Sequence, residues 1–286
     1  MDYYQPPQTE YVQYVAVNTT KNREDFKREV RAAYGGVAEA DTQNQSCGNS
    51  RSCCGVSPKP DSKYSQELGY SQEDLNSVPE GSNMGLGCGN PQAIASLNPG
   101  EVVLDLGAGG GFDAFLAARQ VGPKGKVYGV DMTPEMLSKA RENASKNGYK
   151  NVQFLLGEIE HLPLPNNTVD TIISNCVINL STDKQSVFHE SFRVLKEGGR
   201  IAISDMVASK PLPPEMINNK DLYCNCISGA ITISELKSIL ATAGFTDIVI
   251  EPQENSRMFI KDWVPGSDAE NYVVSAKIMA VKPRAK

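Results

Sequence analysis

Strand-like apolar runs alternate with amphipathic helical segments through the middle of the chain, and this alternation constrains the fold more than any other feature. The strand-like runs are 101–107, 126–131, 152–157, 169–175 and 200–207, interspersed with helical segments at 112–121, 134–148 and 183–195. Strands that alternate with helices at this spacing predict a parallel sheet covered by helices on both faces. A helix at 234–244 and strands at 246–251 and 272–282 follow. We therefore expect an α/β protein with a doubly wound sheet that is mostly parallel and has an antiparallel last strand.

The chain has 286 residues, of which 40% are hydrophobic, so it can bury one large core with a smaller unit beside it. We expect three regions: an N-terminal helix and cysteine-rich loop at 1–63, a cofactor-binding core at 64–210, and a closing segment at 211–286. In the first region, residues 23–36 predict a short helix that ends at Gly35 and Gly36. Just beyond it, Ser71 with Asp74 predicts a capping box that opens the next helix.

Composition excludes several classes of partner. The formal net charge is −6 and the basic residues are scattered, which is unlike a protein that binds nucleic acid. No stretch reaches the roughly 20 apolar residues of a membrane-spanning helix, and the first thirty residues hold no apolar run typical of a secretory signal. We therefore expect a cytoplasmic monomer whose partner is a small molecule, with no nucleic acid and no membrane involved.

A glycine-rich turn follows the first strand in the stretch 104-LDLGAGGGFD-113. Its glycines, Gly107, Gly109 and Gly111, fit Gly-x-Gly-x-Gly, whereas Phe112 breaks the Gly-x-Gly-x-x-Gly pattern of dinucleotide-binding proteins. Such a turn lets a ligand lie against main-chain N–H groups at a helix N-terminus, which suits a carboxylate as well as a phosphate. S-adenosylmethionine carries that carboxylate. Asp131, at the end of the second strand, is placed to accept hydrogen bonds from two ribose hydroxyls.

With 157-GEIEHLP-163, 169-VDTIISN-175 and 193-RVLKEGGRIAISD-205, these motifs resemble the ordered motifs of a Rossmann-like S-adenosylmethionine-dependent methyltransferase, over about 101–207. The resemblance implies that Asp105 lies beneath the methionine amine and that Asn175 is a floor residue near the sulfonium. The cofactor residues that it implies are Asp105, Gly107, Gly109, Gly111, Asp131, Met132, Glu158, Ile159 and Asn175, with Glu158 and Ile159 at the adenine edge. The chain lacks the Asn/Asp-Pro-Pro-Tyr signature of many methyltransferases that act on amides.

The chain has seven cysteines, an odd number in a protein that we expect to be cytoplasmic, which argues against a disulfide framework and leaves metal, redox or nucleophilic chemistry open. Cys88, Cys176, Cys224 and Cys226 fall near the edge of the sheet where the cofactor is expected. Each could be packing, because free cysteine is a common buried residue. Structural zinc is disfavoured, since neither 53-CC-54 nor 224-CNC-226 has Cys-x-x-Cys spacing. A third possibility is a soft trivalent acceptor, whose lone pair needs no general base to take a methyl group.

The stretches 69-GYSQEDLNSVPEGSNMGLGCGNP-91, 157-GEIEHLPLPNNTVDTIISNCVINLS-181 and 223-YCNCISGAITISEL-236 resemble the arsenite S-adenosylmethionine methyltransferases. This resemblance covers most of residues 64–251 and implies that Cys88, Cys176 and Cys226 bind trivalent arsenic. It also implies that a fourth cysteine nearer the N-terminus supplies reducing equivalents. Cys47, Cys53 and Cys54 are all candidates for that role, and we favour the adjacent pair Cys53 and Cys54 over Cys47.

Electron counting adds a consequence to this resemblance. Methyl transfer to trivalent arsenic leaves it formally pentavalent, and a dithiol that becomes a disulfide returns the two electrons. If Cys53 or Cys54 pairs with Cys88, thioredoxin or glutathione must reset the enzyme. Two alternatives stay open: a methyltransferase for an organic molecule of the quinone or sterol type, and a thiol metal-binding sensor. The role of Cys224 is left open as well.

Overall fold

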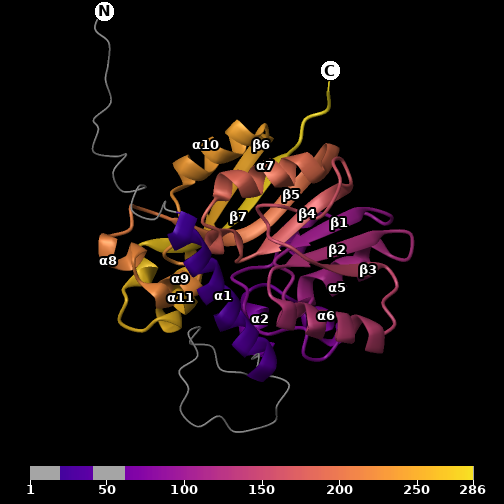
Figure 1. Cartoon of the computed structure of the whole chain (residues 1–286), viewed down its shortest axis with the longest axis horizontal. Coiled ribbons are helices and arrows are strands. Elements are labelled where there is room, and N and C mark those ends of the chain that lie inside the picture. The colour runs from indigo at the N-terminus through magenta and orange to yellow at the C-terminus, as the bar shows by residue number, and fades with distance from the viewer. Residues whose placement is uncertain (1–19, 41–61, 286) are drawn as a thin grey trace, which may run out of the picture.

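The computed structural model describes residues 20–40 and 62–285, and over this part of the chain it contains one seven-stranded sheet (Figure 1). The strands are β1 (Val102–Leu106), β2 (Lys126–Asp131), β3 (Val152–Leu156), β4 (Val169–Asn175), β5 (Leu195–Ala208), β6 (Thr246–Gln253) and β7 (Val273–Val281). Their order is β3-β2-β1-β4-β5-β7-β6, and β7 runs antiparallel to both β5 and β6. The predicted doubly wound sheet with an antiparallel last strand is confirmed. The last strand inserts between β5 and β6, so that β6 forms the edge.

Helices cover both faces of this sheet. The helices on the faces are α4 (Gln92–Ala95), α5 (Phe112–Val121), α6 (Pro134–Lys146), α7 (Lys184–Val194) and α10 (Ile233–Ala243), whereas α1 (Thr20–Ala40) packs beside α6. Alternate residues of the strands serve the two faces, as the pleat requires. Val103 and Ile173 join the apolar cluster under α4, α5 and α6, whereas Leu104 and Ile172 join the cluster under α7 and α10.

A third apolar cluster lies at one end of the sheet, beside α1 and the short helices α8 (Pro214–Ile217), α9 (Lys220–Cys224) and α11 (Arg257–Trp263) (Figure 1). Val30, Ile227 and Ile260 are buried there. This cluster also contains Cys88, Cys176 and Cys226, which come from segments far apart in the sequence. The third cluster therefore brings the cysteines and the N-terminal helix to the same place.

The helix α1 is longer than the sequence predicts. It continues through the paired glycines to Ala40, although Gly35 and Gly36 were expected to end it. A side chain at position 35 would place its Cβ 3.2 Å from Glu135 Oε2 of α6, so Gly35 serves the close approach of the two helices. The capping box at Ser71 and Asp74 is confirmed and opens α3 (Gln72–Ser77), which follows α2 (Ser62–Glu67).

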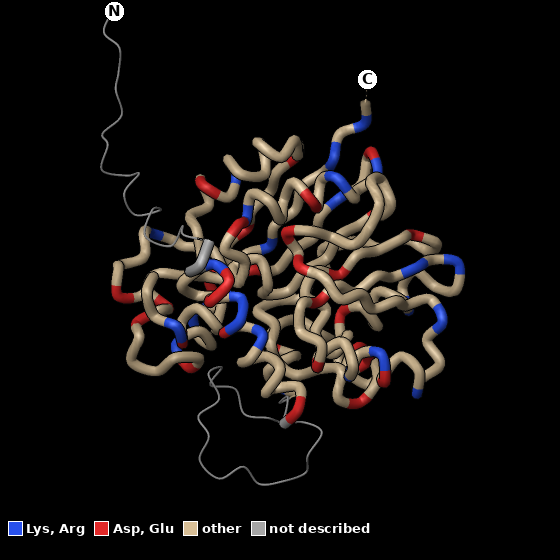
Figure 2. Tube along the Cα trace, viewed as in Figure 1, with Lys and Arg blue, Asp and Glu red and all other residues tan. Residues whose placement is uncertain are grey.

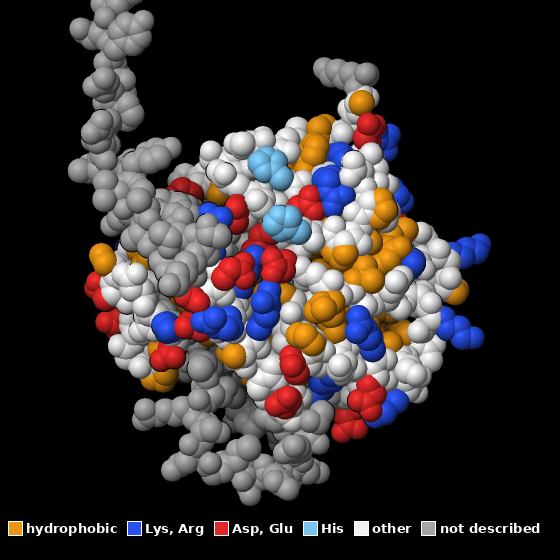
Figure 3. Space-filling model, viewed as in Figure 1, with side chains coloured by type: hydrophobic (Ala, Val, Ile, Leu, Met, Phe, Trp, Pro, Cys, Tyr) orange, Lys and Arg blue, Asp and Glu red, His pale blue; other side chains and the backbone are white. Residues whose placement is uncertain are grey.

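Acidic and basic residues are interspersed along the described trace (Figure 2). Both histidines, His161 and His189, are exposed on the face drawn in Figure 3. None of the described helices combines the length and apolarity that crossing a bilayer would require.

Candidate active site

The glycine loop between β1 and α5 closes against the ends of two neighbouring strands. Gly107 has φ +68°, and a Cβ there would lie 2.3 Å from Cγ2 of Val177, so only glycine fits. The backbone N–H of Gly109 donates to Asp131 Oδ2 (2.9 Å), and the N–H of Thr133 donates to Asp131 Oδ1 (2.8 Å). Asp131 therefore fixes the loop as well as facing the ligand site.

A solvent-open cavity of about 1160 Å³ lies over this loop. Of the sequence-predicted cofactor residues, it is lined by Asp105, Gly107, Gly109, Asp131, Met132, Ile159 and Asn175. Gly111 and Glu158 do not line it. Gly111 (φ +94°) faces the core, because a Cβ there would lie 2.7 Å from Phe115 and 2.8 Å from Phe154.

Asp105 is the buried acid of this cavity. Its side chain is 3% exposed, and Oδ2 has no hydrogen-bond partner among the described residues. Burial first, and then repulsion from Asp113 and Asp131, raise the pKa of Asp105 well above its usual range. A buried carboxylate oxygen without a partner is a site for a cation or a hydrogen-bond donor. The ammonium group of S-adenosylmethionine supplies that chemistry, so the residues present fit the cofactor.

Asp113, in the first turn of α5, was not singled out from the sequence. Its Oδ1 accepts from the Tyr70 hydroxyl (2.7 Å), its Oδ2 accepts from Asn175 Nδ2 (3.2 Å), and burial raises its pKa to about 6. Asn175 also accepts at Oδ1 from the backbone N–H of Cys88 (3.0 Å). Asn175, predicted as a cavity floor residue, thus joins the cofactor cavity to the cysteine loop. An acid directly after a glycine-rich turn was the available signal for Asp113.

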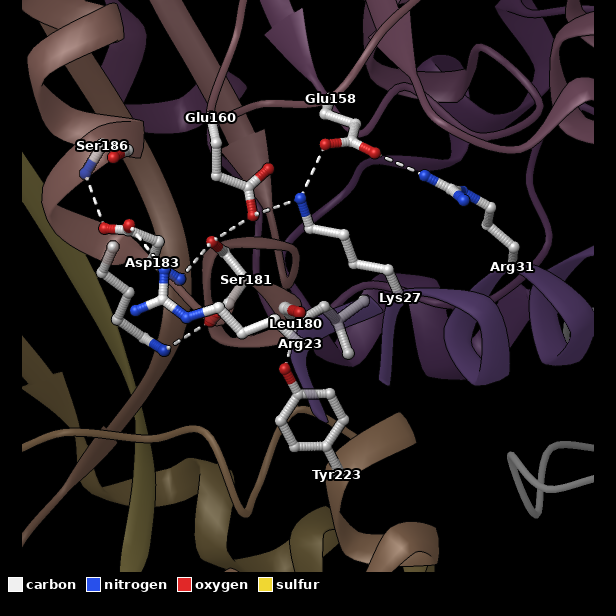
Figure 4. A network of polar contacts seen from close by, with 11 residues as sticks. Arg23, Lys27, Arg31, Glu158, Glu160, Leu180, Ser181, Asp183, Ser186 and Tyr223 are labelled. Atoms are coloured by element: carbon white, nitrogen blue, oxygen red, sulfur yellow. Dashed lines mark hydrogen bonds and ion pairs between the residues drawn. The ribbon is translucent and has the colours of Figure 1, made fainter. Parts of the chain in front are cut away.

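Glu158 points toward α1 instead of the cavity (Figure 4). Its carboxylate accepts from Lys27 Nζ (2.6 Å) and from Arg31, and Lys27 also lies 3.7 Å from Glu160. Burial opposes ionisation, but the Lys27 and Arg31 contacts outweigh it and lower the pKa of Glu158. These ion pairs hold α1 beside the cavity, which Lys27, Val30 and Tyr34 help to line.

The three predicted arsenic ligands lie in one buried cluster, in which the thiols of Cys88 and Cys226 each neighbour that of Cys176. Cys88, Cys176 and Cys226 are all at least 96% buried, and Cys226 Sγ donates to the backbone carbonyl of Cys176 (2.8 Å). The neighbouring thiols of Cys226 and Cys88 raise the pKa of Cys176 well above its usual range. Ligand atoms of Cys88, Cys176 and Asp205 also lie within 4.8 Å of one another.

The loop that carries Cys88 reaches this place through its flanking glycines. A Cβ on Gly87 would lie 2.6 Å from Asn175 Nδ2, and one on Gly89 would lie 2.8 Å from Ser204 Cβ. Glycine on both sides therefore lets the loop lie directly on the ends of β4 and β5. Cys88 Sγ is 3.7 Å from the Ser204 carbonyl at that end of the sheet.

A second solvent-open cavity, of about 660 Å³, borders Cys176 and Cys226 but not Cys88. Tyr34, Tyr64 and Trp263 line it together with Cys224 and Cys226. Cys176 lines both cavities, as do residues 85–87. A soft acceptor held at Cys176 would therefore lie between the cofactor cavity and a second cavity that is lined in part by aromatic side chains.

The N-terminal cysteines Cys47, Cys53 and Cys54 lie outside the described residues. Cys224 is buried and borders the second cavity.

The chain is similar to known methyltransferases. A family model described as "Methyltransferase domain" matches residues 97–244. The arsenite methyltransferase of Halobacterium salinarum is 47% identical over 271 residues, which are 92% of this chain and 68% of the relative. That of Aquipseudomonas alcaligenes is 38% identical over 72% of this chain and 59% of its own length. The crystal structure of an arsenic(III) S-adenosylmethionine methyltransferase from Chlamydomonas reinhardtii superposes with a TM-score of 0.57 at 32% identity, over 79% of this chain and 75% of that one.

Proposed function

This chain belongs to the arsenite methyltransferase family, and from that premise we propose that it methylates trivalent arsenic bound to its own thiolates. It is an S-adenosylmethionine-dependent methyltransferase. The chain spans 59–68% of the length of the two curated relatives described above, so their whole activity is a proposal for it. The observation that carries the proposal is the position of Cys176, which lines both the cofactor cavity and the second cavity beside Cys226.

Binding of arsenite to three thiols is balanced without a base. Each thiol of Cys88, Cys176 and Cys226 gives its proton to one arsenite hydroxyl, and three waters leave as three As–S bonds form. The raised pKa values of Cys176 and Cys226 therefore do not prevent binding, because the proton leaves with the hydroxyl. Trivalent arsenic is a soft centre, so it prefers thiolate ligands to hard oxygen ligands.

The protein places this arsenic beside the cofactor cavity. Asp105 would hold the ammonium group of the cofactor and Asp131 its ribose, while the main chain of the glycine loop would lie against the cofactor. S-adenosylmethionine supplies an electrophilic methyl group on a sulfonium sulfur, which keeps the electron pair of the broken C–S bond. Arsenic uses its lone pair for the new As–C bond and becomes formally pentavalent.

Two electrons return the arsenic to the trivalent state. We propose that Cys53 or Cys54 forms a disulfide with Cys88 in this step, since a dithiol oxidised to a disulfide releases two electrons. Thioredoxin or glutathione then reduces the disulfide. This scheme treats residues 211–286 as the segment that completes the arsenic site, and the enzyme as a monomer.

The test is product analysis of the purified protein with arsenite, a thiol reductant and S-adenosylmethionine. We expect the amount of methylated arsenic, identified by mass spectrometry, to increase with time for the wild-type protein. We expect none for Cys176→Ser. Methylation of an added quinone acceptor instead would favour the organic-substrate alternative. Stoichiometric zinc in the purified protein, with no methylated arsenic, would favour the metal sensor.

A further inference from the structure

Two arsenic-site cysteines adopt an unusual backbone conformation. Cys176 and Cys226 both have φ +60°, in the left-handed region that non-glycine residues rarely adopt. They come from different segments, one at the end of β4 and the other just after α9. Strained conformations of this kind persist only where surrounding contacts determine them. The contacts that hold these two residues should therefore decide whether their sulfurs converge.

The short 3₁₀ helix η1 (Ile178–Leu180) follows Cys176 and is fixed to the end of β5 by Asp205. Asp205 Oδ2 accepts from the backbone N–H of Ile178 (2.8 Å), and Oδ1 accepts from Asn179 Nδ2 (3.0 Å). Oδ1 also accepts from the backbone N–H of Met206 (2.7 Å). Three donors thus already engage the buried carboxylate. Although Asp205 lies beside Cys88 and Cys176, we therefore assign it to holding η1 in place and not to binding arsenic.

The other side of η1 is joined to the Cys226 segment. Asn179 Nδ2 donates to the backbone carbonyl of Cys226 (3.2 Å) as well as to that of Met206 (2.7 Å). The Tyr223 hydroxyl donates to the carbonyl of Leu180 (2.8 Å; Figure 4). A Cβ on Gly229 would lie 2.0 Å from the Asn179 carbonyl oxygen, so the turn after Cys226 lies directly against η1.

We propose that Asn179, Asp205 and Tyr223 form a clamp that positions Cys176 and Cys226 for a single arsenic atom. This inference rests on the proposed function and adds positioning residues that act through the thiols. The clamp connects three segments, β4–η1, β5 and α9, and it leaves Cys88 aside. Cys88 depends on other contacts, since its backbone N–H donates to Asn175 and its carbonyl accepts from Ser275 Oγ (2.8 Å).

The division has a measurable consequence. Methylarsenite has one arsenic valence occupied by carbon, so Cys176 and Cys226 suffice to hold it. Loss of the clamp should impair arsenite and methylarsenite alike, whereas loss of Cys88 should impair arsenite alone. A general loss of stability would instead weaken cofactor binding as well.

The test measures arsenite affinity, the number of sulfurs around arsenic by X-ray absorption, and S-adenosylhomocysteine affinity by calorimetry. For Asn179→Ala we expect arsenite to bind about tenfold to hundredfold more weakly, because a thiolate that is out of position no longer reaches the arsenic atom. Arsenic should keep two sulfurs in place of three, kcat/KM should fall for both arsenicals, and S-adenosylhomocysteine affinity should not change. Ser191→Ala is the matched control, because among the described residues the buried Ser191 hydroxyl bonds only to the Val187 carbonyl of the same helix (2.8 Å).

Wild-type arsenite affinity and three-sulfur coordination in folded Asn179→Ala would overturn the clamp. If that variant does not fold, Tyr223→Phe decides the matter, since it removes one hydroxyl alone. We expect weaker arsenite binding of the same pattern, by a smaller factor, and wild-type affinity would overturn the clamp. A wild-type protein that methylates no arsenical overturns the proposed function instead, so the two failures are distinguishable.

Discussion

The cofactor half of the site, made of the glycine loop 107–111 with Asp105 and Asp131, is built differently from the thiol half, made of Cys88, Cys176 and Cys226. The cofactor half lies at the ends of two adjacent parallel strands and is held largely by backbone groups. The thiol half draws its cysteines from three loops separated by 50 residues or more of chain and depends on buried side chains such as Asn179. The fold itself therefore provides the cofactor cavity, whereas long-range contacts have to assemble the acceptor site.

The largest expected effect lies in the thiol half. Cys176→Ser and Cys226→Ser should each reduce methylation of arsenite and of methylarsenite to background, because a hard, undissociated hydroxyl cannot replace a thiolate on a soft centre. S-adenosylhomocysteine affinity, measured by calorimetry, should not change. Full activity of either variant would mean that this cysteine is packing.

Loss of the proposed redox cysteines should affect methylation of arsenite and of methylarsenite differently. The double variant Cys53→Ser/Cys54→Ser, and separately Cys88→Ser, should lose arsenite methylation and keep methylarsenite methylation, because two thiolates suffice for the methylated substrate. Product speciation by mass spectrometry measures both rates, and a circular-dichroism melt checks folding. Equal loss of both activities in a folded variant would refute this division, and wild-type behaviour of the double variant would assign the role to Cys47.

The cofactor half should respond through affinity. Asp131→Ala removes a charge-assisted ribose contact worth about 1.5–3 kcal/mol, and calorimetry should show cofactor affinity weakened by about tenfold or more. Part of this loss belongs to the loop, since Asp131 also accepts from Gly109 and Thr133. Asp131→Asn, which keeps one acceptor oxygen, should lose less. Unchanged affinity in Asp131→Ala would contradict the ribose contact.

The smallest expected effect is a pH dependence of cofactor stabilisation. Burial raises the pKa of Asp105 and of Asp113, the latter to about 6. The folded acids therefore hold protons that the unfolded chain releases near pH 4, so the cofactor-free fold loses stability as the pH rises from about 4 through the raised pKa values, of which that of Asp113 lies at about 6. A bound ammonium group offsets the two negative charges only where they are ionised.

S-adenosylhomocysteine should accordingly raise the Tm more at about pH 7.5 than at about pH 5. Asp105→Asn should reduce this difference, since one of the two charges is gone. A Tm increase that is equal at both pH values in the wild-type protein would argue against a cationic group beside Asp105.

The sequence predicts the two halves unequally well, for a physical reason. The strand–glycine–helix unit and the Ser71–Asp74 cap depend on neighbouring residues, and they appear as expected. Glu158 was assigned to the adenine edge, but its partners Lys27 and Arg31 lie more than 120 residues away along the chain. The clamp residues Asn179 and Asp205 were missed because their hydrogen bonds connect segments that only the folded sheet brings together.

The end of α1 shows the same limit. Gly35 and Gly36 predict a helix stop from local propensity, yet the helix continues because it packs on α6. Gly111 fits the glycine pattern of the cofactor loop, but its close neighbours are Phe115 and Phe154 in the core. A pattern therefore identifies the loop, and packing decides which of its residues face the ligand.

The most direct test of the central claim is a single turnover of protein preloaded with one equivalent of arsenite, mixed with methyl-labelled S-adenosylmethionine and quenched over time. If Cys176 holds arsenic at the border of the cofactor cavity, wild-type protein should transfer one label to arsenic without any external reductant, and Cys176→Ser should transfer none. Label that stays on the cofactor in the arsenite-loaded wild-type protein, or label that reaches arsenic at the wild-type rate in Cys176→Ser, would contradict the account.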